Sequence, residues 1–507
     1  MESPDLMEPV PIDQNDHQLI ELTRPADWSN PASGQTYDLV VIGGGPAGLV
    51  SAVIAAGLGA KTALVERHRL GGDCLHTGCV PSKALLASAK AIHLRQQSSE
   101  ATNTPGASGE TDFSQIMQRM REVRLRLANH DSAQRLQQLG IDVFFGPARF
   151  ENRQTISVQE SQIAFRRCIL ATGSRPAIPN ISGLDQTNYL TNETLFSLTE
   201  LPSRLSIIGA GPIGVEMAQA FRRFGSQVTL IDQAPRLLPG EDAEASQLLL
   251  EQFKREGIQL HLKTQVLAVK KQDQGHLLQL QSSSQTQTVA GDQLLISTGR
   301  QANLADLNLD AAGIQYTSSG VHVNPRLRTD NRRVFAAGDV TGNQQFTHAA
   351  DAMARLCIRN AFFFGRQRWP QRHVPHTTYT DPEIAQIGLT TAEADRQGIP
   401  LDTYREPLSQ VDRCILEGQE QGLVIVHCKP GRGQVMGATV VGPQAGDLIN
   451  TFSLLMSQKL SLGSLSNAIH CYPTQSQVLQ RLGDQFQRTR LTSLTARLLK
   501  RIIRSRR

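Results

Sequence analysis

The hydrophobic pattern of the chain repeats one unit twice. Residues 37–42 form an apolar run typical of a buried parallel strand, and a glycine-rich turn leads into residues 49–60, which are apolar on nearly every face. The same order returns with a strand at 205–208, a second glycine turn and a helix at 215–224. A second apolar strand closes each unit. We therefore predict one strand–helix–strand unit used twice in one chain.

Other patterns predict what surrounds these two units. Residues 98–111 are rich in Ser, Thr, Gly and Pro, which favours a solvent loop. Residues 114–138 carry apolar side chains at helical spacing and predict an amphipathic helix. Alternating apolar runs at 422–427 and 437–441 predict an antiparallel sheet with helices on one face, in a separate α+β domain over 371–488.

The two ends of the chain differ from its body in composition. Residues 1–36 are polar and contain prolines, so we expect a mobile extension. The tail 489–507 is basic and has no acid, and Leu491, Leu498 and Ile502 recur in it at helical spacing. This pattern predicts a basic amphipathic helix, and a helix of this kind can lie on an anionic membrane surface. The alternatives are docking of the apolar stripe on the protein's own body, and disorder.

Composition restricts the class of protein. The 507 residues exceed the roughly 250–300 that one hydrophobic core holds, so several domains are expected. A hydrophobic fraction of 39% excludes wholesale disorder, and an aromatic fraction of 5% counts against nucleic-acid binding by base stacking. Seven cysteines, an odd number, do not fit a disulfide-stapled secreted scaffold. Because we find no signal peptide and no apolar membrane span, we expect a cytoplasmic protein, with membrane-surface association only through the tail.

Both glycine turns have the context of a dinucleotide site, with a strand before, a helix after, and an acid 23 residues beyond the first glycine. The residues are Gly43, Gly45, Gly48 and Glu66 in the first unit, and Gly209, Gly211, Gly214 and Asp232 in the second. The glycines permit a tight turn, close approach of a pyrophosphate, and packing of helix on strand. The helix N-terminus attracts the phosphates, and the acid accepts hydrogen bonds from the ribose. Two such sites predict FAD and a nicotinamide cofactor.

The acid of the second unit bears on which nicotinamide cofactor is used. A carboxylate at Asp232 favours NAD because it repels a 2′-phosphate. Arg236 places the opposite charge four residues later. The choice between NADH and NADPH therefore stays open.

Cys74 and Cys79 are separated by four residues and are the sharpest chemical signal in the chain. Gly78 and Pro81 mark a bend and a helix start, and a thiol at a helix N-terminus has a lowered pKa that makes it a better nucleophile and metal ligand. The charge of Lys83 lowers that pKa further. A structural zinc site would need four ligands, and no second pair has matching spacing. The pair therefore predicts a reactive dithiol.

With this cysteine block the chain resembles the disulfide-reductase flavoproteins, namely lipoamide dehydrogenase, glutathione reductase and mercuric reductase. The resemblance covers about residues 37–488 and includes, besides the glycine motifs, segments 74–83, 171–173, 297–300, 334–339, 379–383 and 442–446. It implies an α/β fold with two Rossmann-like dinucleotide-binding domains plus a C-terminal α+β dimerisation domain. The implied domains are 37–175 with 299–370 for FAD, 176–298 for NAD(P), and 371–488 for formation of a homodimer with a shared active site.

The resemblance also implies roles for single residues. Cys79 would be the sulfur against the flavin ring, and Cys74 the outer, interchange thiol. Lys83 and Glu216 would pair near flavin N5. Further contacts to the cofactors are implied for Gly72, Thr172, Gly173, Gly299 and Asp339. Electrons would pass from NAD(P)H through FAD to the Cys74–Cys79 disulfide, which opens so that Cys74 meets the acceptor.

One feature of the family is missing near the C-terminus. The usual His–Glu dyad aligns here with Tyr472 and Gln477. Splitting a disulfide substrate benefits from a positioned proton donor, and a tyrosine with a pKa of about 10 is a poor one near pH 7. A thiophilic metal needs no such proton, and mercuric reductases likewise lack this His. We therefore predict mercuric-reductase-like reduction of Hg(II), held transiently by the Cys74 and Cys79 thiolates, or of a similar acceptor.

Several alternatives remain. His470 is a candidate for the missing acid, which would favour a general thiol-disulfide reductase acting on a small molecule, and otherwise it is a structural His. Cys471 is either an additional Hg(II) ligand or a small buried thiol. A flavoprotein redox sensor without turnover, and electron transfer from flavin to quinone or oxygen without the cysteines, are the remaining hypotheses.

Overall fold

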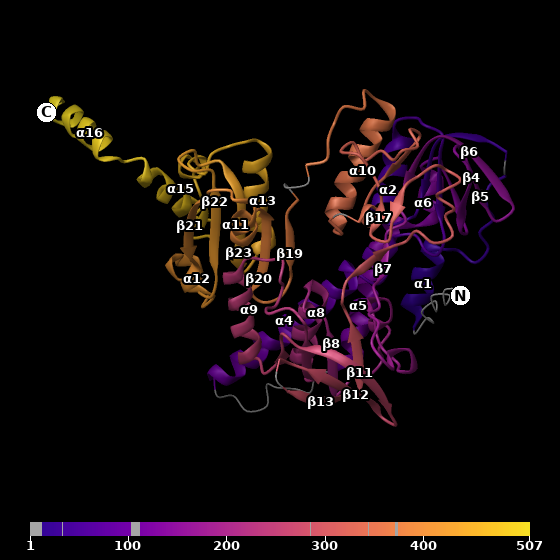
Figure 1. The fold of residues 1–507 in the computed structure, drawn as a ribbon, viewed down its shortest axis with the longest axis horizontal. Coiled ribbons are helices and arrows are strands. Elements are labelled where there is room, and N and C mark those ends of the chain that lie inside the picture. Colours follow the sequence, from indigo (N-terminus) through magenta and orange to yellow (C-terminus); the bar gives the residue numbers. More distant parts are fainter. Residues whose placement is uncertain are drawn as a thin grey trace. The chain divides into compact units, whose positions relative to one another are not determined.

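The computed structural model describes residues 13–32, 34–102, 112–283, 285–342, 344–370 and 374–506. The chain divides into two compact units (Figure 1). The first consists of Met1–Gln233 and Ile258–Trp369, and the second of Ala234–Gly257 and Pro370–Arg507. Both glycine turns lie in the first unit. Residues 234–257 fall outside it, so the segment 176–298, expected as one NAD(P) domain, is divided between the units.

The first glycine turn belongs to a seven-stranded sheet with the order β3-β2-β1-β6-β5-β4, in which β18 also pairs with β6. The parallel strands are β1 (Thr36–Ile42), β2 (Thr62–Glu66), β3 (Ile141–Phe145), β6 (Ser161–Leu170) and β18 (Val334–Ala336). The antiparallel edge is made by β4 (Ala148–Asn152) and β5 (Thr155–Val158). Helix α2 (Pro46–Gly57) follows β1 and packs on α10 (Thr347–Phe362), so the continuous apolar run of β1 is buried. The strand predicted at 37–42 is confirmed.

The second glycine turn belongs to a four-stranded parallel sheet with the order β10-β9-β8-β14. Its strands are β8 (Arg204–Ile208), β9 (Gln227–Ile231), β10 (Gln259–His261) and β14 (Gln293–Ile296). Helix α8 (Pro212–Phe224) joins β8 to β9, which confirms the repeated strand–helix–strand unit. An antiparallel sheet of β11 (Gln265–Gln272), β12 (Gly275–Gln281) and β13 (Thr286–Gly291) adds to this region.

Helices rather than loops carry the cysteine block. The short α3 (Gly72–His76) precedes the long α4 (Cys79–Thr102), so the loop predicted from residue 98 is helical as far as 102, and 103–111 lie outside the described residues. The helix predicted over 114–138 is two helices, α5 (Phe113–Ala128) and α6 (Ala133–Gln138). The break follows from capping, since the side chain of Ser132 accepts a hydrogen bond from the backbone N–H of Arg135.

The N-terminal segment is not a mobile extension over its described part. Residues 14–23 form helix α1 (Gln14–Thr23), capped by the Asp13 side chain, and Leu19 is buried. Ion pairs join Asp13 to Arg121 and Asp16 to Arg124, both with N–O distances of 2.6 Å. The polar composition that predicted mobility thus reflects side chains that pair with α5. Residues 1–12 lie outside the described part of the chain.

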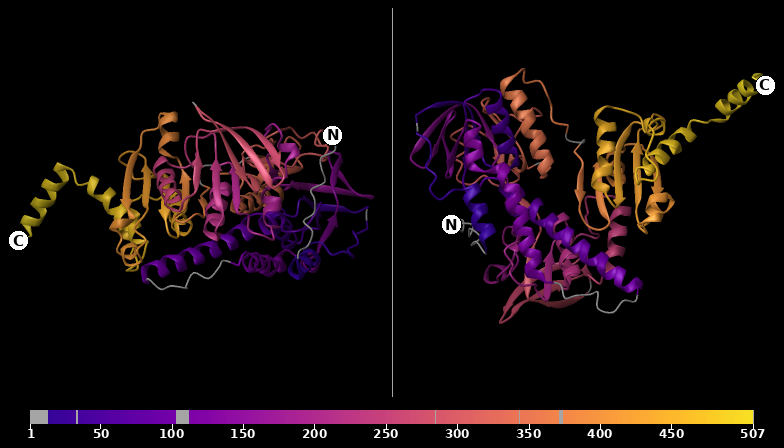
Figure 2. Two further views of the ribbon diagram at one scale, coloured as in Figure 1. Left: turned by 90° about the horizontal axis from the view of Figure 1, so that it is seen from below. Right: turned by 180° about the vertical axis from the view of Figure 1, so that it is seen from behind.

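The second unit is built on a five-stranded antiparallel sheet with the order β19-β20-β23-β22-β21, as the alternating pattern predicts. Figure 1 labels these strands, and Figure 2 shows the same region from two further sides. The strands are β19 (His376–Thr378), β20 (Glu383–Gly388), β21 (Asp402–Pro407), β22 (Leu423–Cys428) and β23 (Val435–Gly442). Helices α13 (Ala445–Ser457) and α15 (Gln477–Thr489) pack on this sheet. Helix α9 (Ala243–Arg255) contacts β23, and its N-cap Asp242 bonds Gln386 and Thr391, which explains why 234–257 belong here.

The basic tail is helical, as predicted. Helix α16 (Ser493–Ser505) is the separate helix at the C-terminal end in Figures 1 and 2. Leu498, Ile502 and Ile503 on it are 59%, 41% and 57% exposed, so these apolar side chains are not buried against the rest of the described second unit. Of the helices in the described ranges, none is long and apolar enough to cross a membrane.

Candidate active site

The two predicted cysteines lie on consecutive helices of the first unit. Cys74 is on α3 and half-buried, whereas Cys79 is the first residue of α4 and exposed, and both are free thiols. The Cys79 sulfur lies 3.3 Å from the hydroxyl oxygen of Thr347, the first residue of α10. The sequence analysis missed Thr347, because it is remote along the chain and belongs to no motif used there.

The two thiols differ strongly in acidity. The pKa of Cys79 is lowered to about 6, first by a hydrogen bond from the Cys74 thiol, then by the Thr347 hydroxyl and the charge of Lys83. The same contact, together with burial, raises the pKa of Cys74. The pKa of Cys79 is therefore lowered, as the sequence predicts, but the neighbouring Cys74 thiol lowers it more than Lys83 does. The arrangement thus favours the thiolate at Cys79 and the protonated thiol at Cys74.

The pH dependence of alkylation reports this difference directly. In the reduced protein, iodoacetamide should react at Cys79 with a midpoint near pH 6, because the thiolate is the nucleophile and is lost only as the pH falls through its pKa. Cys79→Ser should remove this low-pH phase, and Cys74→Ser should move it upward. A wild-type midpoint near that of an ordinary thiol, about 8.5, would contradict the assignment.

Lys83 and Glu216 form an ion pair beside the cysteines. Lys83 on α4 lies 2.8 and 3.1 Å from the two carboxylate oxygens of Glu216 on α8. Glu216 is buried, with 4% of its side chain exposed, whereas Lys83 is 35% exposed. Because α4 packs on α8, the pair connects the cysteine block to the second glycine unit.

The glycine turns fit dinucleotide phosphates. A Cβ on Gly48 would lie 1.7 Å from the carbonyl oxygen of Gly43, and one on Gly214 would lie 1.9 Å from that of Gly209, so helix and turn touch at both places. The N-cap residues of α2 and α8 are Gly45 and Gly211, which have no side chain to cap the helix. First-turn N–H groups therefore remain for an anion.

The two acids after the glycine turns support those turns directly. Glu66 accepts a hydrogen bond from the backbone N–H of Gly44 at 2.5 Å, and Asp232 accepts one from Ala210 at 2.5 Å. Glu66 also accepts from the N–H of His68. Beyond the ribose contact predicted from sequence, each carboxylate therefore holds its own turn in shape.

A second polar cluster surrounds Asp339. Its carboxylate accepts from the Ser174 hydroxyl at 2.6 Å, and Arg300 donates to the same hydroxyl at 2.7 Å. Arg300 also pairs with Asp73, the residue before Cys74. Nearby in the chain, the Thr172 hydroxyl donates to the carbonyl of Asn303. The segments singled out at 172–173, 299–300 and 339 are thus brought together with the cysteine block, a connection that sequence spacing does not reveal.

The residues that replace the missing dyad lie in the second unit. The Tyr472 hydroxyl donates to the Asp412 carboxylate at 3.1 Å, and this negative partner raises the pKa of Tyr472. His470 Nε2 lies 3.1 Å from the carbonyl oxygen of Leu465. Cys471 is exposed, so the interpretation of a small buried thiol is wrong. A tyrosine held by a carboxylate is an even poorer proton donor near neutral pH.

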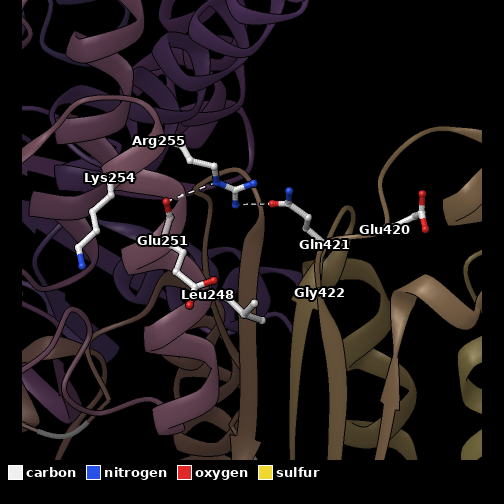
Figure 3. A pocket seen from close by; sticks show the side chains of 7 residues that line it. All are labelled: Leu248, Glu251, Lys254, Arg255, Glu420, Gln421 and Gly422. Atoms are coloured by element: carbon white, nitrogen blue, oxygen red, sulfur yellow. Dashed lines mark hydrogen bonds between the residues drawn. The ribbon is translucent and has the colours of Figure 1, made fainter.

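A hollow of about 650 Å³ in the second unit contains none of the predicted site residues (Figure 3). It is lined by Leu248, Glu251, Lys254, Arg255, Glu420, Gln421 and Gly422, and Arg255 donates to the Gln421 side chain across it. In the ranges that the structure describes, no group of three or more His, Cys, Asp or Glu residues is placed to hold a metal ion.

Comparison with known proteins extends the motifs to almost the whole chain. Residues 37–354 match the family model of the pyridine nucleotide-disulphide oxidoreductases, and 374–482 match that of their dimerisation domain. The mercuric reductase of Bacillus cereus is 33% identical over 89% of this chain and 72% of its own length. The dihydrolipoyl dehydrogenase of Bacillus subtilis (strain 168) is 32% identical over 87% and 96%. A Cu(II) complex of the HOCl-induced flavoprotein disulfide reductase RclA from Escherichia coli has a TM-score of 0.78 at 27% identity, covering 89% and 100%.

Proposed function

The chain belongs to the pyridine nucleotide-disulphide oxidoreductase family, and we propose that it uses NAD(P)H to reduce Hg(II), or a similarly thiophilic metal ion, at Cys74 and Cys79. Members of this family contain FAD, take electrons from NAD(P)H and carry the dimerisation domain found here, so the proposed assembly is a homodimer with a shared active site. The observation that carries the proposal is the placement of two free thiols on consecutive helices, with the Cys79 sulfur at the start of α4 lying 3.3 Å from the hydroxyl oxygen of Thr347.

The residues present fit FAD at the first glycine turn and NAD(P)H at the second. Gly43, Gly45, Gly48 and Glu66, together with Asp339, would hold FAD, and Gly209, Gly211, Gly214 and Asp232 would hold the nicotinamide cofactor. When bound, FAD supplies transfer of an electron pair from NAD(P)H to the cysteine pair. A carboxylate at Asp232 favours NADH, and a strong NADPH preference in kcat/KM would show that inference to be wrong.

The chain's own thiols would bind the metal ion. Hg(II) is a soft ion, and two thiolates are suited to it. The contact with Cys74 and the charge of Lys83 lower the pKa of Cys79, so its thiolate forms more readily than an ordinary one, and metal binding releases the protons that the two thiols still hold. The two electrons that convert Hg(II) to Hg(0) equal those that one NAD(P)H supplies. No proton has to be delivered to a leaving thiolate, which agrees with a tyrosine at 472 that is bonded to Asp412.

A thiol-disulfide reductase is the second candidate, favoured by the dihydrolipoyl dehydrogenase relative and by the imidazole of His470 two residues before Tyr472. In this case His470 would supply the proton that a disulfide substrate needs. Unchanged disulfide turnover in His470→Ala would exclude that role.

Anaerobic NAD(P)H oxidation by the purified protein distinguishes the two functions. With Hg(II) in excess thiol we expect sustained turnover, which Cys74→Ser/Cys79→Ser should abolish because both metal ligands are gone. Cys428→Ala, which removes a buried thiol elsewhere, should retain it. Turnover with glutathione disulfide or lipoamide but not with Hg(II) would refute the metal proposal. Loss of Hg(II) turnover in Cys471→Ser alone would assign metal delivery to that exposed thiol.

We further propose that α16 attaches the enzyme to an anionic membrane surface. Its exposed Leu498, Ile502 and Ile503 form an apolar face, and Arg497, Lys500, Arg501 and Arg504 supply charges complementary to acidic headgroups. Leu498→Glu/Ile502→Glu in the full chain should lower binding to phosphatidylserine-containing vesicles at least about tenfold. Ile178→Glu, at an exposed apolar residue of the first unit, is the matched control. Equal binding of all three proteins, or equal binding to neutral vesicles, would contradict the proposal.

A further inference from the structure

Helix α1 contacts the cysteine block through the residues that adjoin each cysteine. Leu19 on α1 is 3% exposed and forms a buried cluster with Leu75, which follows Cys74, and with Ala128 of α5. Val80, which follows Cys79, packs against the same cluster. The side chain next to each thiol therefore packs in one apolar group with the N-terminal helix.

A charged contact reinforces this apolar one. Arg124 of α5 pairs with Asp16 at 2.6 Å and donates to the carbonyl oxygen of His76 at 3.1 Å. His76 is the last residue of α3, two residues after Cys74. Asp16 and Arg124 have only 12% and 9% of their side chains exposed, so their pairing is more than a solvent-screened surface contact.

The strand end that leads into α3 is held by the same segment. Arg24 donates to the carbonyl oxygens of Arg67 and His68, and the N–H of Leu70 donates to the carbonyl of Thr23. Residues 67, 68 and 70 are thus bonded to the end of α1 or to the residue that follows it. Elsewhere the cysteine block is tied to other parts of the first unit, by Asn192 to Thr77 and by Arg300 to Asp73.

We propose that α1 is a positioning element for the cysteine pair, in which Asp16 and Leu19 hold α3 and the start of α4 so that the Cys74 and Cys79 sulfurs stay in contact. Neither residue touches the sulfurs, so both act through Leu75, Val80 and Arg124. Cys74 lies on α3 and Cys79 is the first residue of α4, so a displacement of α3 relative to α4 changes the separation of the two sulfurs. The inference rests on the cysteine pair alone and holds for a metal or a disulfide acceptor.

The test uses reduced holoenzyme and the pH profile of alkylation at Cys79. Leu19→Ala and Asp16→Asn should each move the midpoint upward, Leu19→Ala by about one unit or more, which is a tenfold fall in the thiolate-to-thiol ratio. Leu19→Met, which keeps the volume, should restore the wild-type profile. Gln18→Ala, an exposed residue of the same helix, should leave it unchanged.

A second readout separates positioning from general damage. FAD content and NAD(P)H oxidation with ferricyanide, which takes electrons from the flavin without the thiols, should stay at the wild-type level in all four variants. Wild-type alkylation profiles in both Leu19→Ala and Asp16→Asn would overturn the proposal. So would a thiol shift that appears only together with loss of FAD and of ferricyanide reduction.

Discussion

Replacing Gly48 by alanine is expected to yield a protein that purifies without FAD. The added Cβ would lie 1.7 Å from the carbonyl oxygen of Gly43, a backbone atom that cannot move aside without opening the turn between β1 and α2. Gly43 itself has a φ of +108° and is in contact with Ala171, so the turn has no space to shift. Absorbance of the purified protein measures the bound flavin.

The equivalent change in the second glycine turn should have a different result. Gly214→Ala places a Cβ 1.9 Å from the Gly209 carbonyl oxygen, so FAD should remain while reduction by NAD(P)H falls at least about a hundredfold. Reduction by dithionite should be unaffected. Gly57→Ala, at the other end of α2 where nothing lies within 4 Å of the new Cβ, is the matched control. FAD retained in Gly48→Ala, or lost in Gly214→Ala, would contradict the assignment of the two turns.

Lys83→Met should produce the second large effect, on stability and on the thiol. It removes the ion pair that Lys83 forms with the buried carboxylate of Glu216, and we expect the free energy of unfolding to fall by about 2–3 kcal/mol. The expected loss is below the ~3–5 kcal/mol of a fully buried pair because Lys83 is 35% exposed. The pKa of Cys79 should rise, since the charge of Lys83 lowers it. Denaturant unfolding and alkylation measure the two effects.

The double variant decides whether loss of the Lys83–Glu216 ion pair is the cause. Lys83→Met/Glu216→Leu should recover most of the lost stability, because no buried charge remains. Lys270→Met, an exposed lysine of β11, should change the unfolding free energy by less than ~0.5 kcal/mol. A double variant as unstable as Lys83→Met would show that the pair is not the source of the effect.

Two predictions from the sequence differ from the structure, each for its own physical reason. The N-terminal segment was expected to be mobile because a polar composition does not reveal partners, yet Asp13 and Asp16 pair with arginines 108 residues away in the chain. The helix predicted at 114–138 is interrupted before α6, because the Ser132 side chain caps the start of that helix although the apolar spacing continues through it. In each case an interaction of individual side chains outweighed the average pattern.

The two strand–turn–helix units, the antiparallel sheet of the second unit and the helix start at Cys79 could all be predicted from the sequence. These features are local, since they depend on glycine sterics, on the period of apolar residues and on a helix start, all within a few residues. Three contacts could be seen only in the folded chain. The Thr347 hydroxyl bonds the sulfur of Cys79, 268 residues away, and Arg300 connects Asp73 to Ser174. Helix α1 packs against the residues that follow the two cysteines. Such contacts depend on how segments that are distant in the chain pack together, and the spacing of residues along the chain does not predict that packing.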